Sequence, residues 1–193
     1  MIEGKANIET VKKVRAAMSL LGFNTCPFIL PSISHDPDLS KNEGSCSMLT
    51  RDITVNTNTV SKFTMFHELT HSQQEYDADS DSGYYQHDGS VDRKKYRDDI
   101  YEQQANIVAG LLTGIVSVRE LFFVFYITKN KDDFLYIAQN IVLQKQIGLP
   151  ALDSNLCGRN IKRLLTRAGR IRYKTFLKEQ FQEGLCRLKN NQL

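Results

Sequence analysis

The chain lacks the motifs of several large protein classes. Its 193 residues contain no Gly-x-Ser-x-Gly elbow, no Gly-rich phosphate loop and no internal repeat. The sequence therefore does not indicate a serine hydrolase of the elbow type, a phosphate-loop nucleotide-binding protein or a solenoid of stacked repeats.

Cysteine is scarce and scattered along the chain. There is no Cys-x-x-Cys pair among the four cysteines, which are Cys26, Cys46, Cys157 and Cys186. This spacing argues against a zinc knuckle or a disulfide framework, so we expect reduced thiols in a cytoplasmic protein. The first residues do not resemble a signal peptide. A toxin or effector secreted by a non-classical route would have the same appearance.

No apolar run is long enough to suggest a membrane span. The most hydrophobic stretch, 111–127, is broken by Gly114 and Ser117 and carries Arg119 and Glu120 in its middle. It falls short of the ~20 uninterrupted apolar residues that a spanning helix needs. Ser117 and Glu120 have the spacing of a capping box, which predicts that a new core helix starts there.

A metal-binding motif is present at residues 67–71, which read His-Glu-Leu-Thr-His. On a helix, His67 and His71 lie one turn apart on the same face, so that both imidazoles can reach one metal ion. Glu68 points to a neighbouring side, where it can accept a proton from a water that the metal activates. This is the pattern of zinc-dependent hydrolases, in which zinc lowers the pKa of that water to ~7.

An ordinary amphipathic helix with two surface histidines is the alternative explanation. Two observations count against it. The chain has only four histidines, and two of them fall in this motif. The flanks also suit a core helix, because Ser61 can cap its start and an apolar stripe recurs every three residues at Phe63, Phe66 and Leu69.

Glu102 is the best candidate for a third metal ligand, 31 residues after His71. It lies in a second helical pattern and shares a face with Ala105, Asn106 and Ala109. Two alanines on this face allow close approach to the histidine helix, and Asn106 is placed to hydrogen-bond a ligand histidine from behind. The alternative for Glu102 is a solvated carboxylate on a helix surface.

Three segments together resemble the ImmA/IrrE family of metallopeptidases. They read RDITVN at 51–56, FTMFHELTH at 63–71 and ExxANxxAxLL at 102–112. The resemblance implies an α+β, zincin-like fold of the gluzincin type, with a small sheet, an active-site helix and a helix that donates a glutamate. By position, His67, His71 and Glu102 match the family's metal ligands, and Glu68 matches its catalytic glutamate.

The resemblance also implies a cytoplasmic zinc peptidase, often linked to cleavage of transcriptional repressors. The match is good over residues 50–114 and continues weakly over 137–169. Thr70 stands where the family usually has glycine, and Thr113-Gly114 replaces the usual Met-Pro. These departures leave the metal ligands in place and bear on subfamily and substrate.

Further elements follow from local patterns. Apolar spacing predicts a helix from Ile8 that ends at Gly22. Phe28–Leu30 is expected to be a strand ended by Pro31, 32–47 a loop and 48–56 a strand. That last strand either forms the edge of the cleft, where an extended substrate can pair with it, or is purely structural. Later helices are predicted at 131–146, 156–168 and 173–189.

The polar connection at 77–99 offers two weaker hypotheses. Asp77, Asp79, Asp81 and Asp88 partly follow the spacing of a calcium-binding loop, but a solvated loop fits better because Ser82 stands where glycine is needed. The connection also holds three residues that can donate a hydrogen bond to an oxyanion or simply pack on the domain. These residues are Tyr84, Tyr85 and His87.

The C-terminal part is strongly basic. Residues 157–193 contain ten Lys or Arg against two Glu, a net charge of +8, whereas the whole chain is +3. This asymmetry suits an anionic partner such as nucleic acid or an acidic protein surface. A solvated helix face explains it equally well.

Together these features predict a zinc endopeptidase with a core at 1–115 and a helical region at 116–193 packed on it. The core would bind one Zn²⁺ per chain and act on a protein substrate, either a transcriptional regulator or a host protein. The rival hypothesis is a catalytically silent zincin scaffold that acts as a regulatory module and binds protein or nucleic acid.

Overall fold

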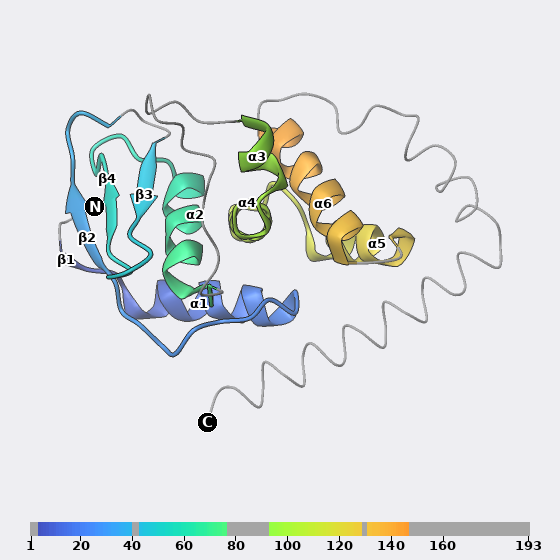
Figure 1. The fold of residues 1–193 in the computed structure, drawn as a ribbon, viewed down its shortest axis with the longest axis horizontal. Coiled ribbons are helices and arrows are strands. Elements are labelled where there is room, and N and C mark those ends of the chain that lie inside the picture. Colours follow the sequence, from blue (N-terminus) through green and yellow to red (C-terminus); the bar gives the residue numbers. More distant parts are fainter. Residues whose placement is uncertain (1–3, 40–42, 77–92, 129–130, 147–193) are drawn as a thin grey trace. The chain divides into compact units, whose positions relative to one another are not determined.

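The computed structural model describes residues 4–39, 43–76, 93–128 and 131–146 (Figure 1). The chain divides into two compact units, Met1–Thr113 and Gly114–Leu193. The described residues form six helices and one small four-stranded sheet, which confirms the predicted α+β class. Within these residues, no helix combines the length and the apolar character needed to cross a membrane.

The sheet is mixed, with the strand order β1-β2-β4-β3. Strands β2 and β4 run parallel, while β1 and β3 are antiparallel to their neighbours. The strands are β1 (Gly4–Lys5), β2 (Ser32–His35), β3 (Gly44–Cys46) and β4 (Ile53–Val55). In this order β3 forms one edge of the sheet.

One face of the sheet is apolar because alternate residues of its strands share a side. Ile33 pairs with Ile53, and both are buried together with Val55. Ser34 and Thr54 lie on the opposite face, where their hydroxyls are 3.0 Å apart. Helix α2 (Lys62–Gln73) packs against β3 and β4.

Helix α1 (Ile8–Leu20) begins at Asn7, whose side-chain oxygen accepts hydrogen bonds from two backbone amides of the first turn. Val11, Val14 and Met18 form its buried stripe. The C-cap of the helix is Leu21, and the predicted glycine, Gly22, follows it in the left-handed conformation with a φ of +71°. Helix α1 packs against both α2 and α4.

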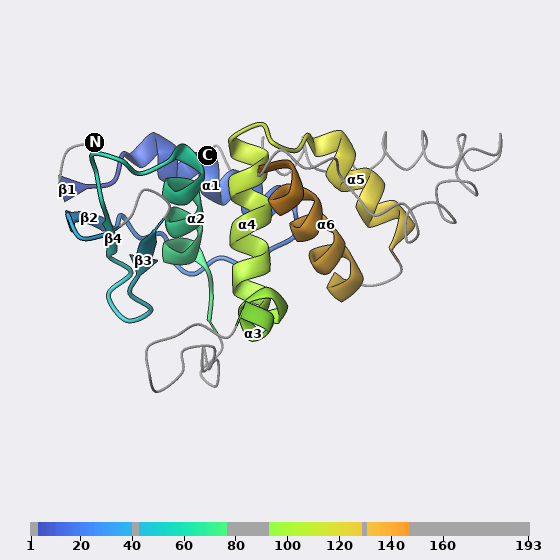
Figure 2. The ribbon, with the colours of Figure 1, turned by 90° about the horizontal axis from the view of Figure 1, so that it is seen from above.

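Helices α2 and α4 (Ile100–Leu112) pack closely, with α2 between the sheet and α4 (Figures 1 and 2). Ser61 caps α2 as predicted, accepting a hydrogen bond from the Thr64 amide at 3.0 Å. Asp99 caps α4 in the same way. On α4, Ala105 and Ala109 are fully buried, as their proposed role in close packing requires.

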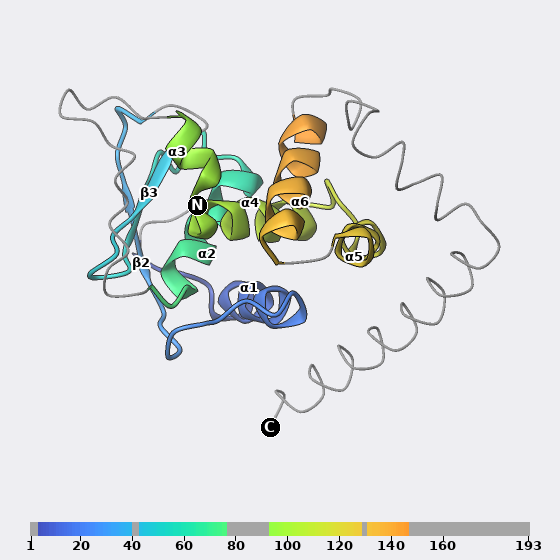
Figure 3. The same ribbon diagram turned by 45° about the vertical axis from the view of Figure 1, so that its right-hand side comes forward.

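The second unit contributes α5 (Val118–Ile127) and α6 (Lys131–Gln146), which pack side by side (Figure 3). The predicted capping box is confirmed, with Ser117 and Glu120 bonded in both directions. An ion pair joins Glu120 to Lys145 of α6. The predicted helix at 131–146 has the predicted bounds.

Several strand predictions were wrong. Residues Phe28–Leu30 form no strand, because this segment turns toward α2, where the Ile29 carbonyl accepts a bond from Gln73. The strands β2 and β3 instead lie in the predicted loop 32–47. They are polar and short, and pairing with the buried β4 provides their backbone partners.

The strand predicted at 48–56 is shorter and lies elsewhere in the sheet than expected. Only Ile53–Val55 is extended, because residues before it form a turn in which Arg51 has a φ of 66°. Strand β4 is paired on both sides, so it does not form the edge of a cleft. The polar connection also contains a short helix that was not predicted, α3 (Arg93–Asp98).

Candidate metal centre

The three predicted ligands converge between α2 and α4. His67 and His71 lie one turn apart on α2, and their Nε2 atoms are 3.0 Å apart. Glu102, in the first turn of α4, places Oε2 3.1 Å from Nε2 of His67 and Oε1 3.4 Å from Nε2 of His71. Among the described residues, these three form the one group of histidine, cysteine and acidic side chains close enough to hold a metal ion.

These distances fit a shared metal ion. Zinc binds imidazole nitrogen and carboxylate oxygen at ~2.0–2.2 Å, so two ligands of a tetrahedral ion lie about 3.3 Å apart. The three observed separations, 3.0, 3.1 and 3.4 Å, cluster around that value. The donor set of two imidazoles and one carboxylate is also the set that zinc takes in hydrolases.

The side chains of the triad are buried. His67 is 7 % exposed, His71 8 % and Glu102 5 %. Neither the surface-histidine alternative nor the solvated carboxylate therefore holds. Polar groups removed from water need partners, and the Nε2 atoms of both histidines and the carboxylate of Glu102 find them in one another.

The carboxylate controls the charge of the site. Burial alone would lower the pKa of His71, but the charge and hydrogen bond of Glu102 outweigh burial and raise it to about 9. Burial in turn favours a neutral Glu102, yet the two histidines hold the pKa of this carboxyl well below its usual range. Glu102 is therefore an ionised carboxylate, which can bind a cation.

Glu68 is buried beside the triad but outside it. Its side chain packs against strand β3, where a Cβ on Gly44 would lie 2.9 Å from its Cγ and 3.0 Å from its Oε1. Only glycine leaves room at this position. Glu68 therefore packs against the edge strand and is not one of the three grouped ligands, but it lies close enough for its charge to act on His71.

Cys46 lies on the same strand and has no role as a thiolate. Burial and the charge of Glu68 raise the pKa of its thiol to about 12. At neutral pH the side chain is therefore a neutral thiol, which is a poor metal ligand and a poor nucleophile.

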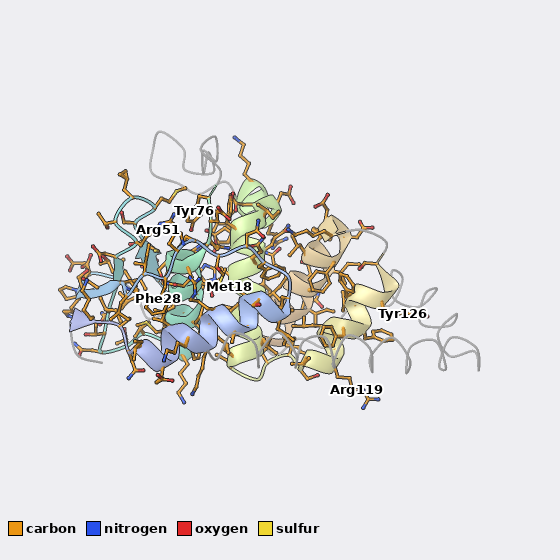
Figure 4. All side chains as sticks on the ribbon, turned by 90° about the horizontal axis from the view of Figure 1, so that it is seen from below. Met18, Phe28, Arg51, Tyr76, Arg119 and Tyr126 are labelled. Carbon is orange, nitrogen blue, oxygen red and sulfur yellow. The ribbon has the colours of Figure 1, made fainter. Side chains whose placement is uncertain are left out.

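Arg51 binds the C-terminal end of α2, the helix that carries His67 and His71. Its guanidinium donates a hydrogen bond to the backbone oxygen of Gln74 at 2.9 Å, just beyond the last turn of α2. The same group lies over the ring of Tyr76, 4.6 Å from its centre (Figure 4). A cation at a helix C-terminus also interacts favourably with the helix dipole.

Thr70, between the two histidines, is accommodated within α2. Thr70 is fully buried, and its hydroxyl donates to the carbonyl of Phe66 at 2.7 Å. The β-branched side chain thus satisfies its polar atom within the helix and leaves the neighbouring histidines in place.

Asn106 does not make the predicted bond to a ligand histidine. It is buried one turn after Glu102, but its Nδ2 has no hydrogen-bond partner among the described residues. Gln74 takes that position instead, with its side-chain oxygen 2.8 Å from Nδ1 of His71. Sequence reasoning missed Gln74 and Gly44. The available signal for Gln74 was its place three residues after His71, where helix neighbours meet.

Several predicted residues lie outside the described part of the chain. They are the proposed oxyanion donors Tyr84, Tyr85 and His87, the aspartate-rich segment 77–88 and the basic residues 157–193. Their proposed roles stay predictions.

The chain was also compared with known proteins. Neither models of protein families, nor curated proteins, nor solved structures give a match to this sequence or fold.

Proposed function

We propose that this protein is a zinc endopeptidase with a zincin-like fold of the gluzincin type, similar to the ImmA/IrrE metallopeptidases. Under this proposal His67, His71 and Glu102 hold one Zn²⁺, and Glu68 is the catalytic base. A protein substrate in the cytoplasm suits the free thiols of Cys26 and Cys46.

One observation carries the proposal. Two imidazole nitrogens and one carboxylate converge within 3.4 Å of one another in a buried site, while a second buried glutamate adjoins them without joining the set. A purely structural zinc site closes its coordination with four protein ligands. Three ligands with an additional carboxylate nearby suit a hydrolytic site better.

In the proposed peptide hydrolysis, the metal and the residues of the chain have separate roles. When bound, Zn²⁺ supplies a Lewis acid that polarises a peptide carbonyl and lowers the pKa of a water to about 7. Glu68 takes a proton from the attacking water and then gives it to the leaving amine. His67, His71 and Glu102 hold their positions throughout, because packing between α2 and α4 fixes them.

The edge strand provides a place for the substrate backbone. Strand β3 pairs with β4 on one side, and its Gly44 packs against Glu68. An extended peptide that adds to the outer edge of β3 would therefore run past the base. This moves the proposed substrate strand from 48–56, as the sequence suggested, to 44–46.

Cleavage-site profiling tests the proposal. Candidate lysates or transcriptional regulators are incubated with the wild type and with Glu68→Gln, and new N-termini are compared. We expect new termini with the wild type only. Zinc bound by both proteins without any wild-type cleavage across bacterial and host proteomes would favour the silent scaffold.

A further inference from the structure

The backbone of Gln74 makes hydrogen bonds to several parts of the protein. It is fully buried directly after α2, and its backbone amide bonds the carbonyls of Thr70 and His71. Its backbone oxygen accepts the Arg51 bond, and the residue forms an isolated β-bridge with Thr25. The backbone position of Gln74 is therefore well defined.

The orientation of its side-chain amide follows from its partners on α4. Nε2 of Gln74 lies 2.8 Å from the backbone carbonyl of Tyr101 and 3.3 Å from Oε1 of Gln104. A backbone carbonyl can only accept a hydrogen bond, so the NH₂ group must face α4. The side-chain oxygen then faces the opposite way, toward His71.

That orientation sets the tautomer of His71. Oε1 of Gln74 lies 2.8 Å from Nδ1 of His71, and an amide oxygen only accepts. Nδ1 must therefore carry the proton. In the neutral imidazole the lone pair is then on Nε2, the atom that faces His67 and Glu102.

We infer that Gln74 is a positioning residue for the metal centre, which fixes the tautomer and ring orientation of His71 and links that ring to the helix bearing Glu102. This role presupposes the proposed metal site. His67 has no such support, because its Nδ1 is buried without a hydrogen-bond partner among the described residues. Of the two ligand histidines, His71 is therefore the one that Gln74 orients, with the Tyr76 hydroxyl 3.2 Å from the same Nδ1.

The neighbouring glutamine is a matched control. Gln73 is also fully buried at the end of α2. Its side chain donates to Ile29 and Ser72 and accepts from Arg15, and none of these bonds reaches the triad. Replacing either glutamine with methionine removes buried hydrogen bonds at similar volume. Only Gln74→Met removes the amide oxygen 2.8 Å from Nδ1 of His71, which leaves the Tyr76 hydroxyl, 3.2 Å away, as the remaining partner of this atom.

The experiment measures Zn²⁺ affinity by competition with a chromogenic chelator. We expect Gln74→Met to bind zinc about 10- to 100-fold more weakly than the wild type, and Gln73→Met to stay near the wild-type value. Gln74→Glu keeps an acceptor for Nδ1–H but loses the NH₂ group that donates to Tyr101, so its affinity should lie between those of Gln74→Met and the wild type. Equal losses in Gln74→Met and Gln73→Met, or a Gln74→Glu affinity no better than that of Gln74→Met, would overturn the inference.

A measurement on the wild type covers the case in which Gln74→Met fails to fold. Long-range ¹H–¹⁵N spectra of the zinc-loaded protein should show a protonated Nδ1 on His71 that exchanges slowly with solvent. Zinc on Nε2 leaves the proton on Nδ1 of either ring, so the exchange rate is the test, and exchange at His71 as fast as at His67 would overturn the role of Gln74. If the wild type binds no Zn²⁺ at all, the proposed metal site fails, whereas zinc binding that ignores Gln74 removes only this inference.

Discussion

The imidazoles of His67 and His71 direct their Nε2 atoms at each other across 3.0 Å. At this distance two nitrogen lone pairs repel unless a proton or a cation lies between them, and Glu102 adds a negative charge to the same point. A site that brings three such groups together favours occupancy by a positive ion.

The first prediction is therefore one Zn²⁺ per chain. Elemental analysis of the purified protein should give a ratio near one for the wild type and near zero for His67→Ala combined with His71→Ala, because two of three ligands are lost. His35→Ala is the control, since His35 lies on β2 and bonds Thr57. Equal zinc in the double variant and the control would contradict the assignment.

Substitutions of the two buried glutamates should have different effects on activity and on zinc binding. Glu68→Gln is expected to lower peptidase activity by roughly 10²–10⁴-fold, the usual contribution of a general base, with zinc content unchanged. Glu102→Gln should instead weaken zinc binding, because an amide is a poorer ligand than a carboxylate. The measurements are peptide cleavage and chelator competition on the same preparations. Loss of zinc in Glu68→Gln would show that Glu68 is a ligand and not the base.

The stability of the metal-free protein should depend on pH. Despite the opposing effect of burial, Glu102 raises the pKa of His71 from 6.5 to about 9. A raised folded-state pKa gives a contribution to stability that is fully present below pH 6.5 and is lost as the pH rises through about 9. The melting temperature should therefore fall across this window, and Glu102→Gln should flatten the dependence. A melting temperature that rises with pH there would contradict the sign.

Zinc binding should show the opposite dependence over the same window. Below pH 9 the metal must displace the His71 proton, so the apparent affinity should rise by about tenfold for each pH unit until the pKa is reached. Chelator competition at several pH values measures this slope. A flat profile would mean that His71 does not release a proton when zinc binds.

Gly44 should be intolerant of any side chain. The Cβ of Gly44→Ala would lie 2.9 Å from Cγ of Glu68 and 3.0 Å from Cγ1 of Val55, so one of them must move. We expect a loss of about 1–3 kcal/mol in the free energy of unfolding from overpacking, and a lower cleavage rate with zinc retained. Ser45→Ala is the control, because Ser45 is exposed on the same strand. Activity equal to the wild type would show that Glu68 does not need this contact.

The sequence by itself determined several helix ends and the histidine pair of the candidate site. Ser61 and Ser117 act on amides within the next turn, and Gly22 ends its helix through its own φ. The spacing of His67 and His71 likewise depends only on helix geometry. Such features involve residues three or four apart, so a local pattern is sufficient to predict them.

Only the tertiary structure decided the sheet and the surroundings of the ligands. Strands β2 and β3 are polar and short, and their pairing with β4 comes from residues up to 20 positions away. The requirement for glycine at position 44 exists only because Glu68 packs there. Gln74 presents its side-chain oxygen to His71 only because its NH₂ group donates to the carbonyl of Tyr101, 27 residues later in the chain. These contacts depend on which segments meet in space, and no local pattern in the sequence records that.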